Sequence, residues 1–190
     1  QFILISIFVL SVNLLFSQKN AQLFEKGDIR IDIKLPHINF MAFNPEKKFR
    51  DAEIGFNGYG IGLEYSYKNK KFIEASASIA TTFIFPFPAP LDAEYNKLLS
   101  TYYFSITDNI IRRRFTFGYG INYSFNNWRE WTRDFDQLGL STTYDSLIVN
   151  KSMGLTLNSY YRLRKNLNLG LIYRPTFYTS TGFNTEHLLS

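Results

Sequence analysis

Hydrophobic and polar residues alternate along residues Arg114–Phe125, which read Arg-Phe-Thr-Phe-Gly-Tyr-Gly-Ile-Asn-Tyr-Ser-Phe. Successive side chains of a β-strand point to opposite faces of its sheet, so one face of this strand is large and apolar and the other is small or polar. The run is about a dozen residues long, whereas strands of soluble proteins usually have five or six. A strand that crosses a bilayer at a tilt needs about this length.

The same alternation recurs along the chain and predicts further strands of matching length and parity. The predicted strands span residues 28–40, 54–67, 72–85, 98–107, 114–125, 146–163, 167–178 and 185–190. The first of them passes through Pro36. The last begins close to the end of the sequence, so we expect this strand to be incomplete.

The connections between these strands are alternately long and short. Residues 41–53, 86–97 and 126–145 form long polar or proline-containing segments, and residues 68–71, 108–113 and 164–166 form tight turns. In an antiparallel up-and-down sheet every second connection lies at the same end, so all the long loops gather at one end. Outer-membrane barrels have this asymmetry. The predicted fold is therefore an all-β, eight-stranded antiparallel up-and-down transmembrane β-barrel with a truncated last strand.

A soluble barrel of the calycin type alternates in the opposite sense, with apolar residues inside around a ligand. Three features favour an apolar outer face here, and the charges of both signs on the polar face, which are described in the next paragraph, are one of them. The polar face consists mainly of Gly, Ser, Thr and Ala, which suits a crowded interior, and Tyr and Phe gather near strand ends, as an interfacial girdle requires. The residues of the central strand that are expected to face lipid are Phe115, Phe117, Tyr119, Ile121 and Tyr123.

Charged residues of both signs fall on the polar face in or near mid-strand. They are Arg30, Asp32, Lys34, Glu64, Glu74, Arg114, Arg162 and Arg174. Buried charges must be paired, and a barrel of about eight strands has room only for side chains. We expect a lumenal network of Glu–Arg pairs that plugs the barrel. An ion path or a ligand site between these charges is the alternative.

The N-terminal segment does not share the alternating pattern of the predicted strands. Residues 1–17 are uncharged and apolar and are too short for a comfortable membrane helix. They resemble the hydrophobic region and cleavage site of a secretory signal peptide whose start is missing, and an N-terminal anchor helix is the alternative. Residues 22–190 are assigned to one barrel domain.

Composition narrows the function classes. The chain has 190 residues, 45% of them hydrophobic and 18% aromatic, and no cysteine, which excludes disulfides and thiol chemistry. Its mean hydropathy of −0.15 is what alternation produces. The net charge of +5 fits an anionic partner or a basic surface, and no nucleic-acid partner is expected because the sequence has no basic tract or nucleic-acid module.

Candidate chemistry is sparse. His37 and His187 are the only histidines, and no metal-binding or nucleophile motif surrounds them, so no catalytic residue, cofactor or metal is assigned. Both histidines fall near loop ends of adjoining strands, which keeps a lipid-modifying barrel enzyme as an alternative. Aromatic residues of the long loops are candidates for contact with a partner, glycan or lipopolysaccharide, or for packing over the barrel mouth. They are Phe85, Phe87, Trp128 and Trp131.

Gly-Tyr-Gly-Ile occurs at residues 58–61 and again at 118–121, and Leu-Gly-Leu-Ile-Tyr-Arg-Pro occurs at residues 169–175. With the strand rhythm, these motifs resemble the small outer-membrane β-barrel proteins of Gram-negative bacteria, the OmpA/OmpX-like group, and especially the barrel-domain proteins of Bacteroidota. The resemblance covers residues 22–190. The aromatic-ended final strand of the family is absent here.

The resemblance implies insertion into the bacterial outer membrane by the barrel assembly machinery, with the lipid bilayer and lipopolysaccharide as surroundings. It implies no single activity, because one fold hosts many functions. We expect a monomeric, non-enzymatic outer-membrane barrel with a plugged polar lumen and with extracellular loops for structural, adhesive or partner-binding roles.

Overall fold

The computed structural model describes residues 24–44, 51–82, 95–135, 141–164, 166–179 and 182–190 and contains a single antiparallel sheet. The strands are β1 (Ile29–Lys34), β2 (Ile38–Phe43), β3 (Asp51–Lys68), β4 (Lys71–Thr81), β5 (Tyr95–Arg112), β6 (Phe115–Phe135), β7 (Ser141–Arg164), β8 (Leu167–Thr179) and β9 (Gly182–Leu189). None of the described residues forms a helix long and apolar enough to cross a bilayer. The predicted signal peptide lies outside the described residues.

The first strand is interrupted at residues 35–37. β1 pairs with the second half of β3, with Lys34 opposite Gly60, and β2 pairs with the first half, with Ile38 opposite Phe56. Pro36 lies in the break, and a proline cannot donate to the ladder, so pairing stops there. Counted as one broken strand, β1 and β2 complete the eight strands of the prediction.

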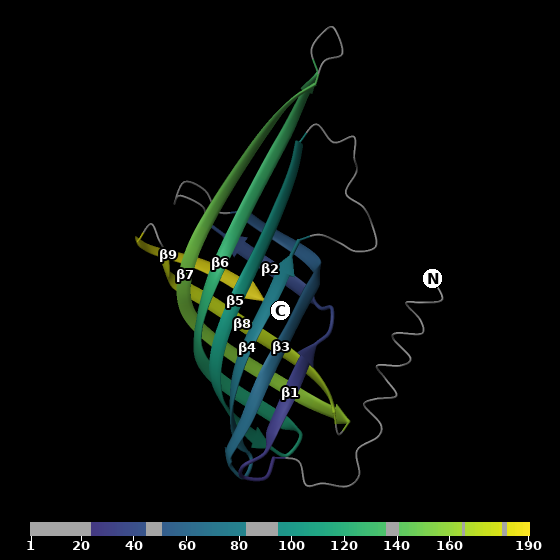
Figure 1. The fold of residues 1–190 in the computed structure, drawn as a ribbon, viewed down its shortest axis with the longest axis vertical. Helices are drawn as coiled ribbons and strands as arrows, with labels where there is room; N and C mark the ends of the chain where they lie inside the picture. The colour runs from purple at the N-terminus through teal and green to yellow at the C-terminus, as the bar shows by residue number, and fades with distance from the viewer. Residues whose placement is uncertain (1–23, 45–50, 83–94, 136–140, 165, 180–181) are drawn as a thin grey trace, which may run out of the picture.

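The sheet closes on itself through β2 and β9. Each strand from β3 to β9 pairs with its neighbour in sequence, and β9 pairs with β2 through Phe40–Leu189, Met41–Leu188 and Ala42–His187. The predicted all-β, up-and-down, ring-closed architecture is thereby confirmed (Figure 1). Within the described residues β1 pairs only with β3, so the ring is closed along the half that contains β2 and β9.

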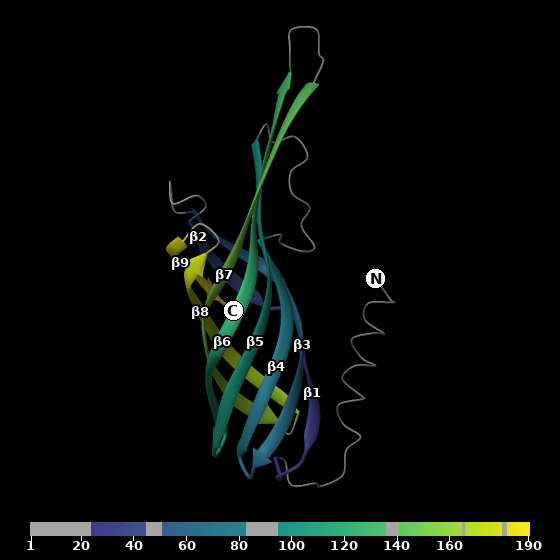
Figure 2. The same cartoon turned by 60° about the vertical axis from the view of Figure 1, so that its left-hand side comes forward.

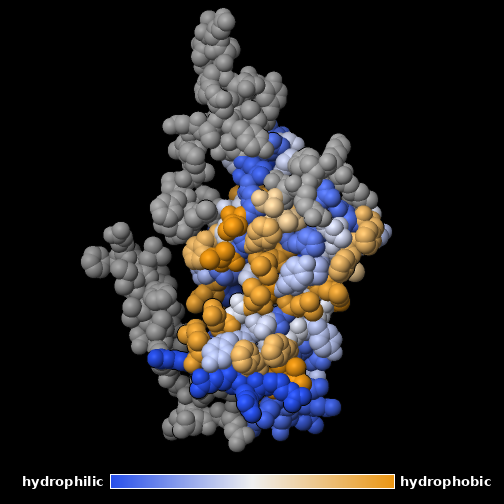
Figure 3. All heavy atoms as spheres, turned by 180° about the vertical axis from the view of Figure 1, so that it is seen from behind, coloured by the Kyte–Doolittle hydropathy of each residue, from blue (hydrophilic) through white to orange (hydrophobic). Residues whose placement is uncertain are grey.

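The sense of the alternation is apolar side out. Phe117, Tyr119 and Ile121 are 47%, 66% and 59% exposed, whereas Asn122 is 3% exposed and points inward with the polar face. One face of the molecule accordingly shows an apolar belt above a hydrophilic end (Figure 3). A barrel folded around an apolar ligand would show the reverse distribution, so the described interior does not fit the calycin alternative.

Strands β5, β6 and β7 extend far beyond the rest of the barrel (Figure 1, Figure 2). The prediction that residues 126–145 form a loop is wrong, because β6 and β7 pair continuously from Phe115–Tyr161 to Phe135–Ser141. The predicted turn at residues 108–113 is also too long, since β5 continues to Arg112. Polar residues misled both predictions.

Candidate functional site

The interior near the tight turns contains part of the predicted charge network. Arg30 Nε donates to Glu64 Oε2 at 2.9 Å, and Lys34 Nζ lies 2.5 Å from Glu74 Oε1 and 3.0 Å from Asp32 Oδ2. These residues come from β1, β3 and β4, which are neighbours in the sheet. Glu64 therefore pairs with an arginine, in agreement with the predicted Glu–Arg network, whereas Glu74 pairs with a lysine, and both of these cations lie on β1.

Phe24 covers the tight-turn end of this network. The Arg30 guanidinium carbon lies 3.3 Å from the centre of the Phe24 ring, and that of Arg162 lies 5.0 Å from it. The ring of Phe72 packs 5.2 Å away, measured between centroids. Two guanidinium groups that share one aromatic ring gain cation–π attraction. The segment before β1 therefore contributes a cap for the lumen.

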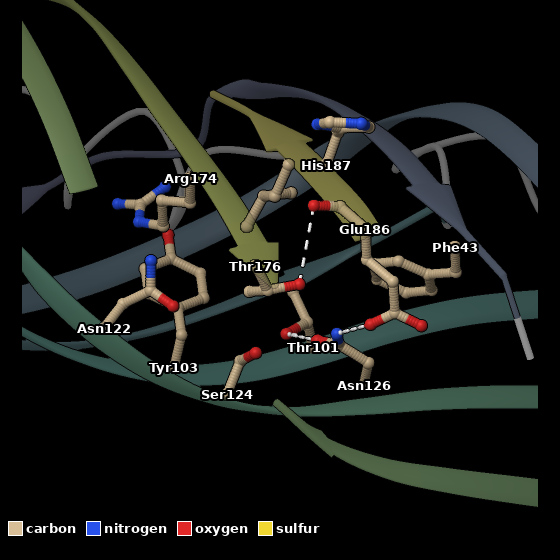
Figure 4. Close-up of a pocket in the computed structure, with 11 residues that line it drawn as sticks. Phe43, Thr101, Tyr103, Asn122, Ser124, Asn126, Arg174, Thr176, Glu186 and His187 are labelled. Atoms are coloured by element: carbon tan, nitrogen blue, oxygen red, sulfur yellow. Dashed lines mark hydrogen bonds between the residues drawn. The ribbon is translucent and has the colours of Figure 1, made fainter. Parts of the chain in front are cut away.

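The opposite half of the interior contains a hydrogen-bond network in which the Glu186 carboxylate is surrounded by uncharged polar side chains. The Glu186 carboxylate accepts hydrogen bonds from Asn126 Nδ2 at 2.5 Å and from Ser152 Oγ at 3.0 Å, and Thr101 Oγ1 donates to Asn126 Oδ1 at 2.6 Å. Figure 4 shows Glu186, Asn126 and Thr101 converging from different strands. Glu186 is only 1% exposed. A residual cavity of about 10 Å³ beside them has room for about one water molecule.

Arg174 and Arg114 have different positions. Arg174 is 2% exposed, and its guanidinium carbon lies 3.9 Å from the centre of the Tyr103 ring. It also donates to Ser190 Oγ at 3.3 Å. Arg114, which was predicted to be lumenal, is exposed at the tight-turn end, where it donates to Tyr161 Oη at 3.4 Å. Arg114 lies in the β5–β6 turn, directly after Arg113, which has a φ of 58°.

An apolar cluster fills the interior at the long-loop end. It consists of Met41, Phe43, Ala80, Leu99, Tyr103, Trp128 and Leu188. Trp128 is 7% exposed and belongs to β6, so it is part of this interior plug and is not a loop contact. Trp131 is half-buried further along β6, with the Arg129 guanidinium carbon 5.7 Å from its ring centre. Phe85 and Phe87 lie outside the described residues.

The two histidines do not form a common site. The His37 ring contacts Gly58 on the inner side of the barrel wall, whereas His187 stacks on Tyr173 and accepts or donates a hydrogen bond with its hydroxyl at 2.9 Å. His187 alternates with the inward-facing Glu186, so it lies on the outer face. The described residues contain no group of three or more side chains arranged to hold a metal ion. The described side chains of the interior pack against one another and form ion pairs.

The closed ring, the inward-facing polar residues and the protruding strands can be compared with known structures. The fold is similar to the crystal structure of Ail, the attachment invasion locus protein of Yersinia pestis, with a TM-score of 0.52 over 86% of this chain and 93% of that one. The two share the barrel fold. Their sequence identity is 10%, so the likeness to Ail concerns the fold alone. No protein-family model matches the chain, and no curated protein matches it.

Sequence reasoning missed Phe24 and Glu186 as interior residues. Glu186 could have been found, because it shares parity with Asn184 and Leu188 in a short alternating run. Phe24 precedes the first strand and has no periodic neighbour to mark its direction. Its interior position depends on a reversal of the chain in which the backbone of Lys70 donates to the Phe24 carbonyl at 3.2 Å.

Proposed function

We propose that this chain is a non-enzymatic outer-membrane β-barrel protein whose lumen is plugged and whose loops and protruding strands contact a partner outside the cell. The observation that carries the proposal is the inverted distribution of side chains. Large apolar residues such as Tyr119 and Ile121 are exposed, and charged residues such as Glu74 are buried at 3% exposure. Such a surface is costly in water and favourable in hydrocarbon.

The outer face supplies the contact with lipid in this proposal. Phe115, Phe117, Tyr119, Ile121 and Tyr123 are all exposed to between 37% and 66%. The protein is proposed to be a monomer, because the ring closes within one chain through β2 and β9. Insertion by the barrel assembly machinery and contact with lipopolysaccharide follow from the same localisation.

The lumen is proposed to be closed to ions. Phe24 with its two arginines covers one end, and the cluster around Trp128 and Met41 fills the other. Reconstitution of the full chain in a planar bilayer is expected to show no stepwise conductance. Regular conductance steps that survive extensive purification would contradict the plugged lumen and favour the ion-path alternative.

The partner-binding part is proposed to be the projecting sheet, defined as residues 95–98, 129–135 and 141–147. Its central strand β6 pairs on both sides. The pairing of β4 with β5 ends at Ser100, and the pairing of β8 with β7 ends at Ser152, so the described outer edges of the projecting sheet have no β-partner. Free edges can accept another strand. The attachment in the full name of Ail is a property of that protein, and it supports an adhesive role here by analogy of fold.

The decisive experiment is the migration of the full chain in detergent gels with and without boiling. A folded transmembrane barrel resists the detergent and migrates differently from the boiled chain, and the protein is expected in the outer-membrane fraction of the cell. A chain that folds in buffer without detergent and shows no heat-dependent migration would refute the proposal. A second experiment replaces His37 and His187 and measures the lipid acyl composition of the cell. An unchanged composition is expected for a non-enzymatic barrel, and a changed one would favour a lipid-modifying enzyme.

A further inference from the structure

The tight-turn end of the barrel is strongly basic. The β3–β4 and β5–β6 turns lie side by side, because the Ile111 backbone N–H donates to the Lys70 carbonyl at 2.9 Å. Together they form the basic turn cluster, which consists of Lys68, Lys70, Lys71, Arg112, Arg113 and Arg114. All of these residues are exposed except Lys71, which is half-buried. Asp108 is an acid close to this cluster, and its carboxylate accepts the Tyr67 hydroxyl at 2.8 Å.

Two of these cations occupy backbone positions that favour glycine. Lys70 and Arg113 have φ angles of 65° and 58°. Side chains other than those of Gly, Asn and Asp rarely adopt this left-handed conformation, which costs about 1 kcal/mol. The turn geometry alone would be easier with glycine, so the local backbone does not explain why positive charge stands at both positions.

An apolar hollow lies on the outer face of the barrel above this cluster. Its volume is about 660 Å³, and its floor is formed by Ala75 and Ala77 of β4. Larger side chains of the neighbouring strands form its walls, because Leu63 and Ile106 lie opposite Ala75 while Ile61 and Phe104 lie opposite Ala77. Two consecutive outward alanines between larger side chains leave a groove that is called the outer hollow below.

The cluster and the hollow share one strand. Lys71 and Ala77 are six residues apart on β4, which corresponds to about 20 Å along the strand at ~3.3 Å per residue. With a tilt of ~40°, this is about 15 Å along the membrane normal, the thickness of one hydrocarbon leaflet. A molecule with an anionic head at the turns and an apolar chain reaching the membrane centre would match both features.

We propose that this strip binds an anionic glycerophospholipid of the periplasmic leaflet. Its phosphate contacts Lys70, Lys71 and Arg112 at the turns, and one acyl chain lies in the outer hollow. Charge complementarity selects the anionic head, since each Lys or Arg near an anionic surface contributes about fivefold to binding. The inference rests on the proposed function, because only a membrane-inserted barrel presents this strip to a lipid leaflet.

The test uses the full chain refolded into vesicles, with a single fluorescent label. The sequence contains no cysteine, so Ile79→Cys provides a unique attachment point on β4 beside Ala77. Vesicles of phosphatidylcholine contain an equal small fraction of either brominated phosphatidylglycerol or brominated phosphatidylcholine, which quench the label on contact. The anionic quencher is expected to be at least about fivefold more effective.

Two sets of substitutions test separately the contact with the lipid head group and the contact with the lipid acyl chain. Replacement of Lys70, Lys71, Arg112 and Arg113 by glutamine is expected to make both brominated lipids quench equally, whereas Lys151→Gln on exposed β7 is the matched control and retains the preference. Ala75→Leu fills the outer hollow and is expected to reduce quenching by the anionic lipid. Ser159→Leu adds the same bulk to the outer face of β7 and should leave quenching unchanged.

Heat-dependent migration of each sample shows whether the barrel has inserted. Equal quenching by both lipids in an inserted, heat-modifiable parent protein would overturn the lipid inference and leave the proposed function standing. Failure of every sample to insert, with a soluble folded chain instead, would overturn the proposed function itself. Loss of the preference in Lys151→Gln as well would show a diffuse charge effect and would also overturn a site at these turns.

Discussion

Lys34 of β1 and Glu74 of β4 form an ion pair at 2.5 Å although β3 lies between their strands. The pair can span β3 because this strand presents Gly60 and Gly62 to the lumen. A Cβ at Gly60 would lie 3.1 Å from the Lys34 side chain, and one at Gly62 would lie 3.1 Å from Glu74 Oε1. The two side chains are 9% and 4% exposed, so the glycines leave space for a buried pair.

Removing one partner of this pair is expected to destabilise the barrel. Glu74→Ala leaves the Lys34 ammonium with only Asp32 as a charged partner, and breaking a buried pair costs about 3–5 kcal/mol. The free energy of unfolding in urea, measured in detergent micelles, checks this. The double variant Lys34→Met with Glu74→Met removes both charges and should recover most of the loss. Equal destabilisation by the single and double variants would contradict a paired, dry interior.

Filling the space at Gly60 is expected to disturb the same region. A Cβ at this position would clash with the Ser78 hydroxyl, so Gly60→Val should cost about 1–3 kcal/mol of overpacking. Ser78→Gly removes the clashing atom, and the double variant should regain stability beyond the sum of the single changes. The Ser78 hydroxyl has no hydrogen-bond partner among the described residues, so its loss alone should have little effect. Strict additivity in the urea unfolding cycle would contradict the close approach.

The two tryptophans are expected to respond differently to truncation. Trp128 is 7% exposed within the interior cluster, and replacing a buried tryptophan by alanine costs about 3–5 kcal/mol. Trp131 lies beyond the cluster in the projecting sheet, so Trp131→Ala should change the free energy of unfolding of the barrel by less than about 1 kcal/mol. The unboiled gel mobility and the urea midpoint report the difference. A larger loss for Trp131→Ala would show that the projecting sheet belongs to the core.

Acidification is expected to loosen the projecting sheet first. The hydrogen bonds from Arg129 hold the pKa of the Asp145 carboxyl below its ordinary value, so the pair stabilises the folded sheet above the unfolded pKa of about 4. This contribution is lost as the pH falls through the lower folded pKa. Proteolysis within the sheet, measured with an acid protease, should increase below about pH 4 while the barrel remains heat-modifiable. Asp145→Asn should show the increased cleavage already at higher pH, and Asp28→Asn at the other end should not.

Much of the wall of the barrel could be predicted from local pattern, but little of its interior contact map. The parity of Phe117 and Asn122 follows from the backbone of one strand and was predicted correctly. The partners of Glu64 and Glu74 were not, because two lumenal side chains meet only through the register and tilt of all the strands between them. Trp128 was predicted to lie in a loop for a similar reason. The strand continues there because β6 and β7 pair with each other, and the polar residues around Trp128 obscure the alternation of hydrophobic and polar positions.

The sequence by itself determined that the chain alternates and that one face of each strand is apolar. These properties are local, because the period of two is built into extended backbone. The tertiary structure confirmed that the apolar face points outward, and it alone decided that β1 and β2 share β3 and that Lys34 reaches Glu74 across two glycines. Closure of the ring through β2 and β9 determines which side of the sheet is enclosed and which side chains share the enclosed space, and neither can be derived from one strand alone.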